Sequence, residues 1–210
     1  MTSYKALAWY AGALNDSLWQ RKPNVLVLGG SGGCGTTGIQ LARSFGAGNI
    51  TTTTSANNFQ YCRGLGADAL IDYETANWWD VLESESQDII YDTVGQRGTG
   101  DRAMDKLRAG GYYVTITGAM ATTVKAGCHQ AAFINSDTNL ANLKELDALT
   151  ALVASNKLRM PNIDGIFQLS DVAEAFKVSE GGQVTGKLVI SVANATAVPR
   201  PYYGSNTEHE

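Results

Sequence analysis

A glycine-rich turn near the start of the chain has the residue types and spacing needed to hold phosphate groups. It reads Gly30, Ser31, Gly32, Gly33, Cys34 and Gly35, which matches the pattern G-x-G-x-x-G. In that pattern the first glycine permits a tight turn, the second lets the backbone approach a pyrophosphate, and the third lets the next helix pack close to the strand. Free amides and the positive dipole end of the helix favour an anion there. The alternative is a structural glycine turn without a ligand.

The residues after the second expected strand bear on which nicotinamide cofactor such a turn would hold. NAD-binding versions carry an acidic residue about 20 positions beyond the glycines, where it bonds the ribose hydroxyls. Here Thr54 and Ser55 stand at that distance, and the next acidic residue is Asp68. An acid would repel a 2′-phosphate, whereas hydroxyls can bond it, so the sequence favours NADP(H) over NAD(H). A basic partner for that phosphate is not evident, since Asn57 and Asn58 occupy the positions where one would be sought and Arg63 lies a turn further on.

Alternating strand and helix patterns position this turn. Asn24–Leu28 is a continuous apolar run, typical of a strand covered on both faces, and a helical stripe follows over Thr36–Phe45. Strands separated by helices of about ten residues imply βαβ units and a parallel sheet. The sequence therefore predicts an α/β fold, a Rossmann-type doubly wound parallel sheet with a C-terminal helix–strand arm. Further strands are expected at Ile50–Thr54, Ala69–Asp72, Asp88–Asp92, Tyr112–Thr117 and Gln130–Ile134, and further helices at Phe59–Leu65, Trp78–Ser84, Arg102–Ala109 and Leu140–Ala154.

The regular alternation of strand and helix patterns changes in the last third of the chain. The dinucleotide-binding domain is expected over residues 23–155, and the arm over residues 156–192, with strands at Ile163–Leu169 and Lys187–Val192. From residue 193 onward the chain is polar and holds Pro199 and Pro201, so residues 193–210 are predicted to be a disordered tail.

Composition excludes several classes of protein. The net charge of −4 over 210 residues gives no basic face for a nucleic acid. No apolar run approaches the roughly 20 residues that cross a bilayer, and no signal-peptide pattern is present. His129 beside Cys128 lacks a second Cys–His set, so no metal site is expected. The Tyr-x-x-x-Lys pair of short-chain dehydrogenases, the G-x-S-x-G motif and the Walker A motif are all absent.

Longer stretches carry a family resemblance. In chain order they are VLVLGGSGGCGTTGIQLARSFGA, LGADALIDY, DIIYDTVG and GGYYVTITG. These resemble the medium-chain dehydrogenases/reductases, in particular the zinc-free quinone oxidoreductases and the mitochondrial reticulon-interacting NADPH reductases. Residues 156–192 are similar to the C-terminal segment of that family in order and spacing.

The resemblance implies cofactor contacts spread over the chain. Relatives often have arginine where this chain has Thr185, and usually valine where it has Cys34. By position, the resemblance assigns Ser31, Gly33 and Cys34 to the phosphates, Ser55 to the 2′-phosphate, Tyr73 to the adenosine end, Thr93 and Val94 to the wall beside the middle of the cofactor, Ile116 and Phe133 to the nicotinamide, and Gln183, Val184 and Thr185 to a late loop that closes on the cofactor.

The resemblance also implies an activity. The expected function is NADPH-dependent reduction of a quinone or enone, with hydride passing from the nicotinamide to a small electrophilic carbonyl or quinone substrate. No catalytic acid or base is identified in the sequence. The alternative is a truncated, non-catalytic fragment or isoform that acts by binding the nucleotide alone.

Relatives begin with a catalytic domain that this sequence lacks. The resemblance therefore implies that residues 1–22 are a remnant of the interdomain helix and that the arm normally returns to the missing domain. A homodimer is expected through the sheet edge near Gln130–Ile134. The expected location is cytoplasmic, or mitochondrial if a targeting segment precedes Met1.

Overall fold

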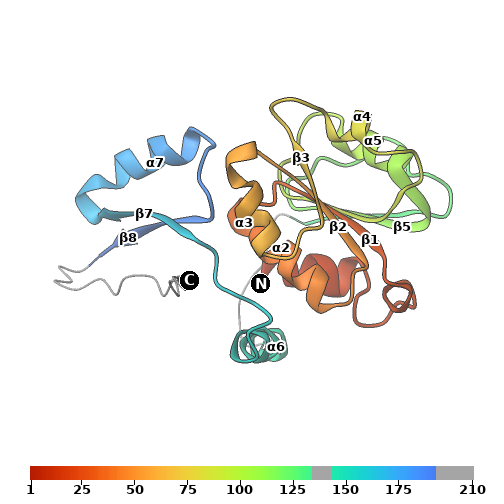
Figure 1. Cartoon of the computed structure of the whole chain (residues 1–210), viewed down its shortest axis with the longest axis horizontal. Coiled ribbons are helices and arrows are strands. Elements are labelled where there is room, and N and C mark those ends of the chain that lie inside the picture. The colour runs from red at the N-terminus through yellow and green to blue at the C-terminus, as the bar shows by residue number, and fades with distance from the viewer. Residues whose placement is uncertain (134–142, 193–210) are drawn as a thin grey trace, which may run out of the picture. The chain divides into compact units, whose positions relative to one another are not determined.

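The computed structural model describes residues 1–133 and 143–192 (Figure 1). The chain divides into two compact units, Met1–Pro161 and the segment from Asn162 onward, and each is considered by itself. The predicted disordered tail at 193–210 lies outside the described residues, as do Ile134 of the expected sixth strand and the start of the helix expected at Leu140.

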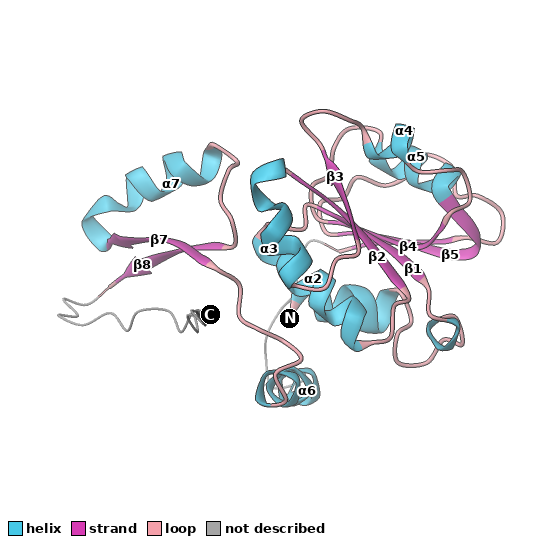
Figure 2. Cartoon of the chain, in the orientation of Figure 1, coloured by secondary structure: helices cyan, strands magenta, loops and turns pink. Residues whose placement is uncertain are grey.

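A six-stranded sheet forms the centre of the first unit, and all its neighbouring strands pair in parallel (Figure 2). The strand order is β3-β2-β1-β4-β5-β6, so the direction of winding reverses between β1 and β4. The predicted Rossmann-type α/β fold is confirmed. The strands are β1 (Asn24–Leu28), β2 (Asn49–Thr54), β3 (Ala69–Asp72), β4 (Gln87–Asp92), β5 (Leu107–Thr115) and β6 (His129–Ala132).

Two apolar layers cover the sheet, one on each face, because successive strand residues point to opposite sides. Val25 and Val27 of β1 pack in one buried cluster, and Leu26 and Leu28 pack in the other. The first cluster includes residues of α2, α3 and the N-terminal helical segment, and the second includes residues of α4 and α5. The helices of this unit are α2 (Gly33–Ser44), α3 (Phe59–Gly64), α4 (Trp78–Val81), α5 (Thr99–Lys106) and α6 (Leu143–Ala154).

The N-terminal segment is packed into the first unit. Its helical turns are α1 (Thr2–Tyr4) and a π-helical segment, Lys5–Tyr10, in which Ala6 and Leu7 are fully buried. Ser3 Oγ donates to the carbonyl oxygen of Cys34 at 2.8 Å. This bond ties the start of the chain to the first turn of α2.

The junction between α5 and β5 corrects the sequence-based prediction. A helix was expected over Arg102–Ala109, but α5 ends at Lys106 and β5 begins at Leu107. Leu107 is fully buried and pairs with Gln87, and the register then slips before Tyr112 pairs with Ile89. Pairing with β4 thus overrides the helical pattern. The expected helix Trp78–Ser84 is also shorter, since α4 ends at Val81.

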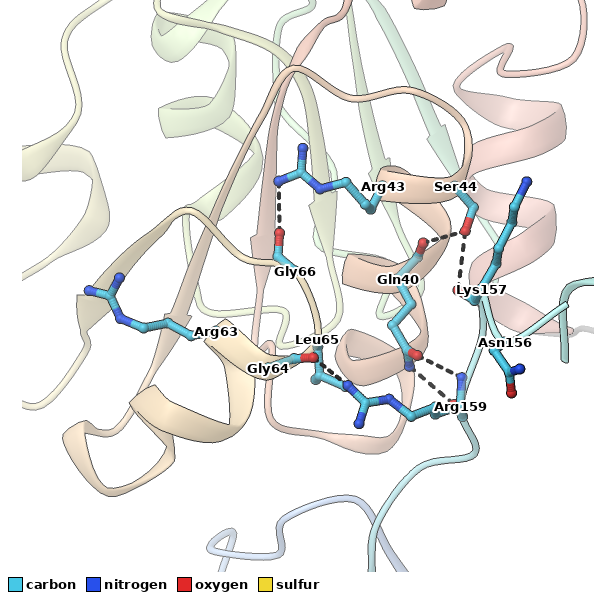
Figure 3. Close-up of a pocket in the computed structure, with 10 residues that line it drawn as sticks. All are labelled: Gln40, Arg43, Ser44, Arg63, Gly64, Leu65, Gly66, Asn156, Lys157 and Arg159. Atoms are coloured by element: carbon cyan, nitrogen blue, oxygen red, sulfur yellow. Dashed lines mark hydrogen bonds between the residues drawn. The ribbon is translucent and has the colours of Figure 1, made fainter. Parts of the chain in front are cut away.

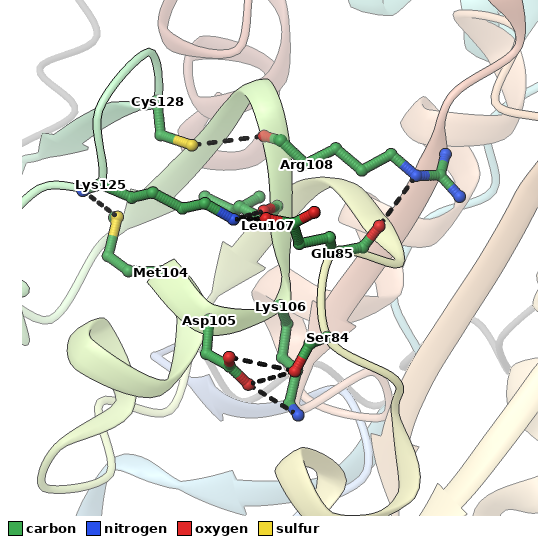
Figure 4. A network of polar contacts seen from close by, with 9 residues as sticks. All are labelled: Ser84, Glu85, Met104, Asp105, Lys106, Leu107, Arg108, Lys125 and Cys128. Atoms are coloured by element: carbon green, nitrogen blue, oxygen red, sulfur yellow. Dashed lines mark hydrogen bonds and ion pairs between the residues drawn. The ribbon is translucent and has the colours of Figure 1, made fainter.

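Side-chain contacts hold the start of β5 in place (Figure 4). Lys125 Nζ donates to Leu107 O at 2.8 Å and pairs with Glu85 Oε1 at 2.6 Å. Arg108 Nε donates to Glu85 O at 3.0 Å, and the Cys128 thiol donates to Arg108 O. These groups lie at the amino end of β5, away from the edge of the sheet at which the strands have their carboxyl ends.

The second unit contains a small parallel sheet of two strands joined by a helix. Its elements are β7 (Ile163–Gln168), α7 (Val172–Glu180) and β8 (Lys187–Ser191).

Candidate functional site

The expected cofactor residues of the first unit follow the carboxyl ends of successive strands. The glycine turn follows β1, Ser55 follows β2 and Tyr73 follows β3, with Thr93 and Val94 after β4. Ile116 follows β5 and Phe133 follows β6. In open parallel sheets ligands bind outside the carboxyl ends, at the point where the strand order reverses. Here that point lies between β1 and β4, the strands that carry the glycine turn and Thr93–Val94.

Hydrogen bonds to β2 fix the start of the glycine turn. Gly29 N donates to Thr53 Oγ1 and Gly30 N donates to Thr53 O, both at 2.9 Å. Gly29 has a φ of 79°, a conformation that favours glycine. The turn therefore has a defined shape before any ligand binds.

The glycines of the turn are required for different reasons. A Cβ on Gly35 would collide with the carbonyl of Gly29, and one on Gly30 would collide with Thr52 Oγ1. A Cβ on Gly32 would meet only the Gly29 carbonyl oxygen, at 3.4 Å, and otherwise open space. Internal packing thus explains Gly30 and Gly35 but not Gly32. The space beside the Gly32 Cα fits the close approach of a pyrophosphate.

Backbone donors converge at the start of α2. Gly32 is the N-cap residue and makes no side-chain cap bond. The amides of Gly33, Cys34 and Gly35 belong to the first turn, where no intrahelical acceptor exists. Beside them, Thr54 Oγ1 donates to Ser31 Oγ at 3.0 Å. The arrangement can bind an anionic oxygen with several donors at once.

The residues assigned to the adenosine end lie on adjacent strand ends. Thr54 of β2 pairs with Asp72 of β3, so Ser55 and Tyr73, the next residue after each strand, lie at adjacent strand ends. Ser55 is buried and its hydroxyl accepts a bond from Asn58 Nδ2 at 3.2 Å. Tyr73 is 49% exposed, so its ring is available to a ligand at this edge.

The turn after β4 lies against the glycine turn. Thr93 Oγ1 donates to Leu28 O at 2.7 Å, and a Cβ on Gly29 would come within 2.8 Å of Val94 Cγ2. Val94 itself is 58% exposed. The structure thus brings Thr93 and Val94 to the glycine turn.

Asp92 was not among the residues expected from the sequence. It is fully buried at the end of β4, and Val94 N and Gly95 N each donate to its Oδ1 at 2.9 Å. Tyr113 OH donates to Oδ2 at 3.0 Å. The available signal was an acid at the end of the apolar run DIIYD, where a buried carboxylate is costly unless hydrogen-bonded.

The remaining assigned residues differ in their surroundings. Ile116 N donates to Asp92 O at 3.1 Å, so Ile116 lies beside the β4 turn. Phe133 is buried and stacks on Tyr10, with ring centroids 4.9 Å apart. Gln183, Val184 and Thr185 belong to the second unit, between α7 and β8, and their role as a closing loop stays a prediction.

A separate pocket of about 490 Å³ lies by the C-terminal half of α2 (Figure 3). It is rich in cations, but Arg43 pairs with Asp68 and donates to Gly66 O, and Arg159 donates to Gly64 O. Gln40 holds the Arg159 backbone through both its amide atoms, and Arg63 points away from these contacts. Because Arg43 and Arg159 already donate to Asp68 and to carbonyl oxygens at the end of α3, we do not take this pocket as the candidate cofactor site.

Two further findings concern the described part of the chain. Within residues 1–133 and 143–192, no group of three or more His, Cys, Asp or Glu side chains is placed to hold a metal ion. The helices in these ranges are too short or too polar to cross a membrane.

Comparison with known proteins gives one family model and several relatives. The family model described as zinc-binding dehydrogenase matches residues 65–190. The 2-methylene-furan-3-one reductase of Solanum lycopersicum is 36% identical over 170 residues, which cover 80% of this chain and 40% of that protein. The mitochondrial NAD(P)H oxidoreductase RTN4IP1 of Danio rerio is 32% identical over 89% of this chain and 54% of its own length. The chain thus spans about half the length of the curated relatives it matches.

A solved structure agrees with these sequence matches. The quinone oxidoreductase from Coxiella burnetii has a TM-score of 0.74 and is 29% identical, covering 91% of this chain and 57% of that chain.

Proposed function

The chain belongs to the zinc-binding dehydrogenase family of the medium-chain dehydrogenase/reductase superfamily, and from this premise we propose that it binds NADP(H) at the carboxyl edge of its sheet. The proposed activity is reduction of a small quinone or enone. When bound, the nicotinamide would supply the hydride. The protein would bind the cofactor, orient it and exclude water.

The observation that carries this proposal is the space beside Gly32. The other motif glycines, Gly30 and Gly35, are required by internal packing. Gly32 borders open space next to the first-turn amides of α2, which have no acceptor within the helix. A dinucleotide phosphate is the ligand that this combination fits best, because it needs both close backbone approach and several donors.

The preference for the 2′-phosphorylated cofactor rests on the residues just after β2. Ser55 and Asn58 form a neutral hydroxyl–amide pair there, and no carboxylate stands at the ribose position. A neutral pair tolerates the charge of a 2′-phosphate, which an acidic residue would repel.

The proposed substrate class rests on the relatives. Their names include a 2-methylene-furan-3-one reductase and an NADPH-dependent alkenal/one oxidoreductase, both of which describe reductases of conjugated carbonyl compounds. Binding of the nucleotide without turnover is the second candidate.

The test measures binding and turnover separately. We expect NADPH to bind with a dissociation constant about tenfold below that of NADH, as measured by quenching of tryptophan fluorescence. We expect NADPH oxidation when a simple quinone or an α,β-unsaturated ketone is added. Tight binding without oxidation would support the binding-only candidate. No binding of either cofactor would overturn both candidates.

Assembly and location are also proposed. β6 is an edge strand of the sheet, and a homodimer through this edge predicts twice the monomer mass in light scattering. A cytoplasmic location stays a prediction.

A further inference from the structure

We propose that Asp92 is a positioning residue that holds the turn Thr93–Gly95 in the shape that closes the middle of the cofactor crevice. The inference rests on the proposed function. It adds a residue that touches no ligand but fixes the backbone that does.

The Asp92 carboxylate bonds the turn directly. Asp92 is fully buried, and Oδ1 accepts two successive backbone amides of the turn, Val94 N and Gly95 N, at 2.9 Å each. Oδ2 accepts Tyr113 OH at 3.0 Å. A side chain that accepts the amides two and three positions ahead replaces the turn's own backbone bond, so the carboxylate sets the turn's conformation.

The turn Thr93–Gly95 is confined on both sides. Gly95 has a φ of 73°, and a Cβ there would collide with Thr117, so the turn has little freedom on its inner side. Its outer side meets Gly29, the residue before the G-x-G-x-x-G motif, through Thr93 and Val94. The turn therefore packs on the glycine turn at the point where the strand order reverses.

The buried charge of Asp92 needs a reason to be retained. A buried carboxylate is costly, and its partners here are hydrogen-bond donors rather than a cation. An apolar residue would suit the core of β4 better. The presence of the carboxylate is accounted for if the shape of the turn matters for binding.

The same strand offers a matched control. Asp88, at the other end of β4, accepts Asn24 N at 2.7 Å and pairs with Arg108 Nη1 at 3.0 Å. Both aspartates thus accept a backbone amide and a second donor. Only Asp92 lies at the cofactor edge.

The experiment compares Asp92→Ala, Asp92→Asn and Asp88→Ala, using NADPH and 2′,5′-ADP as probes. The second probe consists of the adenosine end with its 2′-phosphate and one 5′-phosphate, so it lacks the part of the cofactor assigned to the β4 turn. We expect Asp92→Ala to weaken NADPH about tenfold and 2′,5′-ADP less than about twofold. Asp88→Ala should lower stability in urea unfolding but leave both affinities unchanged.

Asp92→Asn should bind NADPH within about threefold of wild type. Its side-chain oxygen can still accept both turn amides, and its nitrogen can donate to the phenol oxygen of Tyr113. The single phenol proton can then be donated to Ala119 O, the other acceptor within reach at 2.7 Å. If Asp92→Ala does not fold, the NADPH affinity of Asp92→Asn still tests the inference.

Three results would overturn the inference. The first is an unchanged NADPH affinity in Asp92→Ala, and the second is an equal loss of affinity for both probes in that variant. The third is an NADPH affinity of Asp92→Asn that falls much more than threefold below that of wild type. If the wild-type chain binds neither probe, the proposed function itself fails, and the inference fails with it.

Discussion

At the scale of single residues, the glycine turn contains glycines of two kinds. Gly35 is needed because any side chain would collide with the Gly29 carbonyl, which holds α2 close to the turn. Gly32 has an extended backbone, with a φ of −72°, and room for a side chain. Packing within the fold therefore accounts for Gly35 but not for Gly32, for which we propose a role in binding the cofactor.

This difference predicts opposite effects of two alanine substitutions. Gly35→Ala should lower the free energy of unfolding by about 1–3 kcal/mol, because overpacking displaces α2. Gly32→Ala should change it by less than about 0.5 kcal/mol but weaken NADPH at least about tenfold, because the new methyl group occupies the space of the phosphates. Urea unfolding and fluorescence titration of both variants check the pair. Full NADPH affinity in Gly32→Ala would contradict the assignment.

A second residue-scale prediction concerns pH. Tyr112 OH donates to Asp16 Oδ2 at 2.5 Å, which raises the pKa of Tyr112 to about 12 and, with the Leu18 amide, lowers the pKa of Asp16. The contribution of the Tyr112 hydroxyl to the free energy of unfolding is complete below the pKa of about 10 that tyrosine has in the unfolded chain. It is lost as pH rises toward 12, the pKa of Tyr112 in the folded chain. The Asp16 contribution is present above about pH 4 and is lost as pH falls through its lowered pKa.

The variant Tyr112→Phe removes this hydrogen bond. Between about pH 7 and 9 we expect it to be less stable than wild type by a constant amount of about 1 kcal/mol. The Tyr112 ring also stacks on His129, with ring centroids 4.6 Å apart, and this contact is kept in the variant. Above pH 10 the difference should shrink. Urea unfolding at several pH values measures it, and a difference that stays constant up to pH 12 would contradict the account.

At the scale of elements, the N-terminal helical segment is coupled to α2 through a buried chain of hydrogen bonds. Tyr91 OH donates to Ser3 Oγ at 3.1 Å, and Ser3 Oγ donates to Cys34 O. The Tyr91 ring in turn packs against α2, since a Cβ on Gly38 would come within 2.9 Å of it. α1, β4 and α2 are therefore linked through the hydroxyl of Ser3, next to the glycine turn.

A double-mutant cycle tests this coupling. Ser3→Ala should cost about 1–3 kcal/mol, because it leaves the buried Tyr91 hydroxyl without a partner. In a Tyr91→Phe background the same substitution should cost about 1 kcal/mol less. Free energies of unfolding for the four proteins give the coupling. Strictly additive costs would show that the two hydroxyls act independently.

Elements also show what sequence patterns can predict. β1 and β4 were predictable because strands covered on both faces are continuous apolar runs. The α5–β5 junction was not, because Leu107 pairs with Gln87, a contact that local periodicity does not contain. The glycine turn was found from a local motif, whereas Asp92 was missed because its complete burial, and its bond to Tyr113, come from packing between strands.

At the scale of the whole molecule, the chain is a Rossmann-type α/β fold followed by a small βαβ unit. Its family membership is established over residues 65–190, and the carboxyl edge of the six-stranded sheet gathers the residues assigned to the cofactor in the first unit. The central claim is that this edge, and not the arginine-rich pocket beside α2, binds the dinucleotide.

Hydrogen–deuterium exchange with and without saturating NADPH tests that claim most directly. We expect slower exchange of amides in the glycine turn, around Ser55 and in the turn Thr93–Gly95, with little change around Gln40 and Arg159. Protection centred on Gln40 and Arg159, or no protection at the glycine turn, would contradict it.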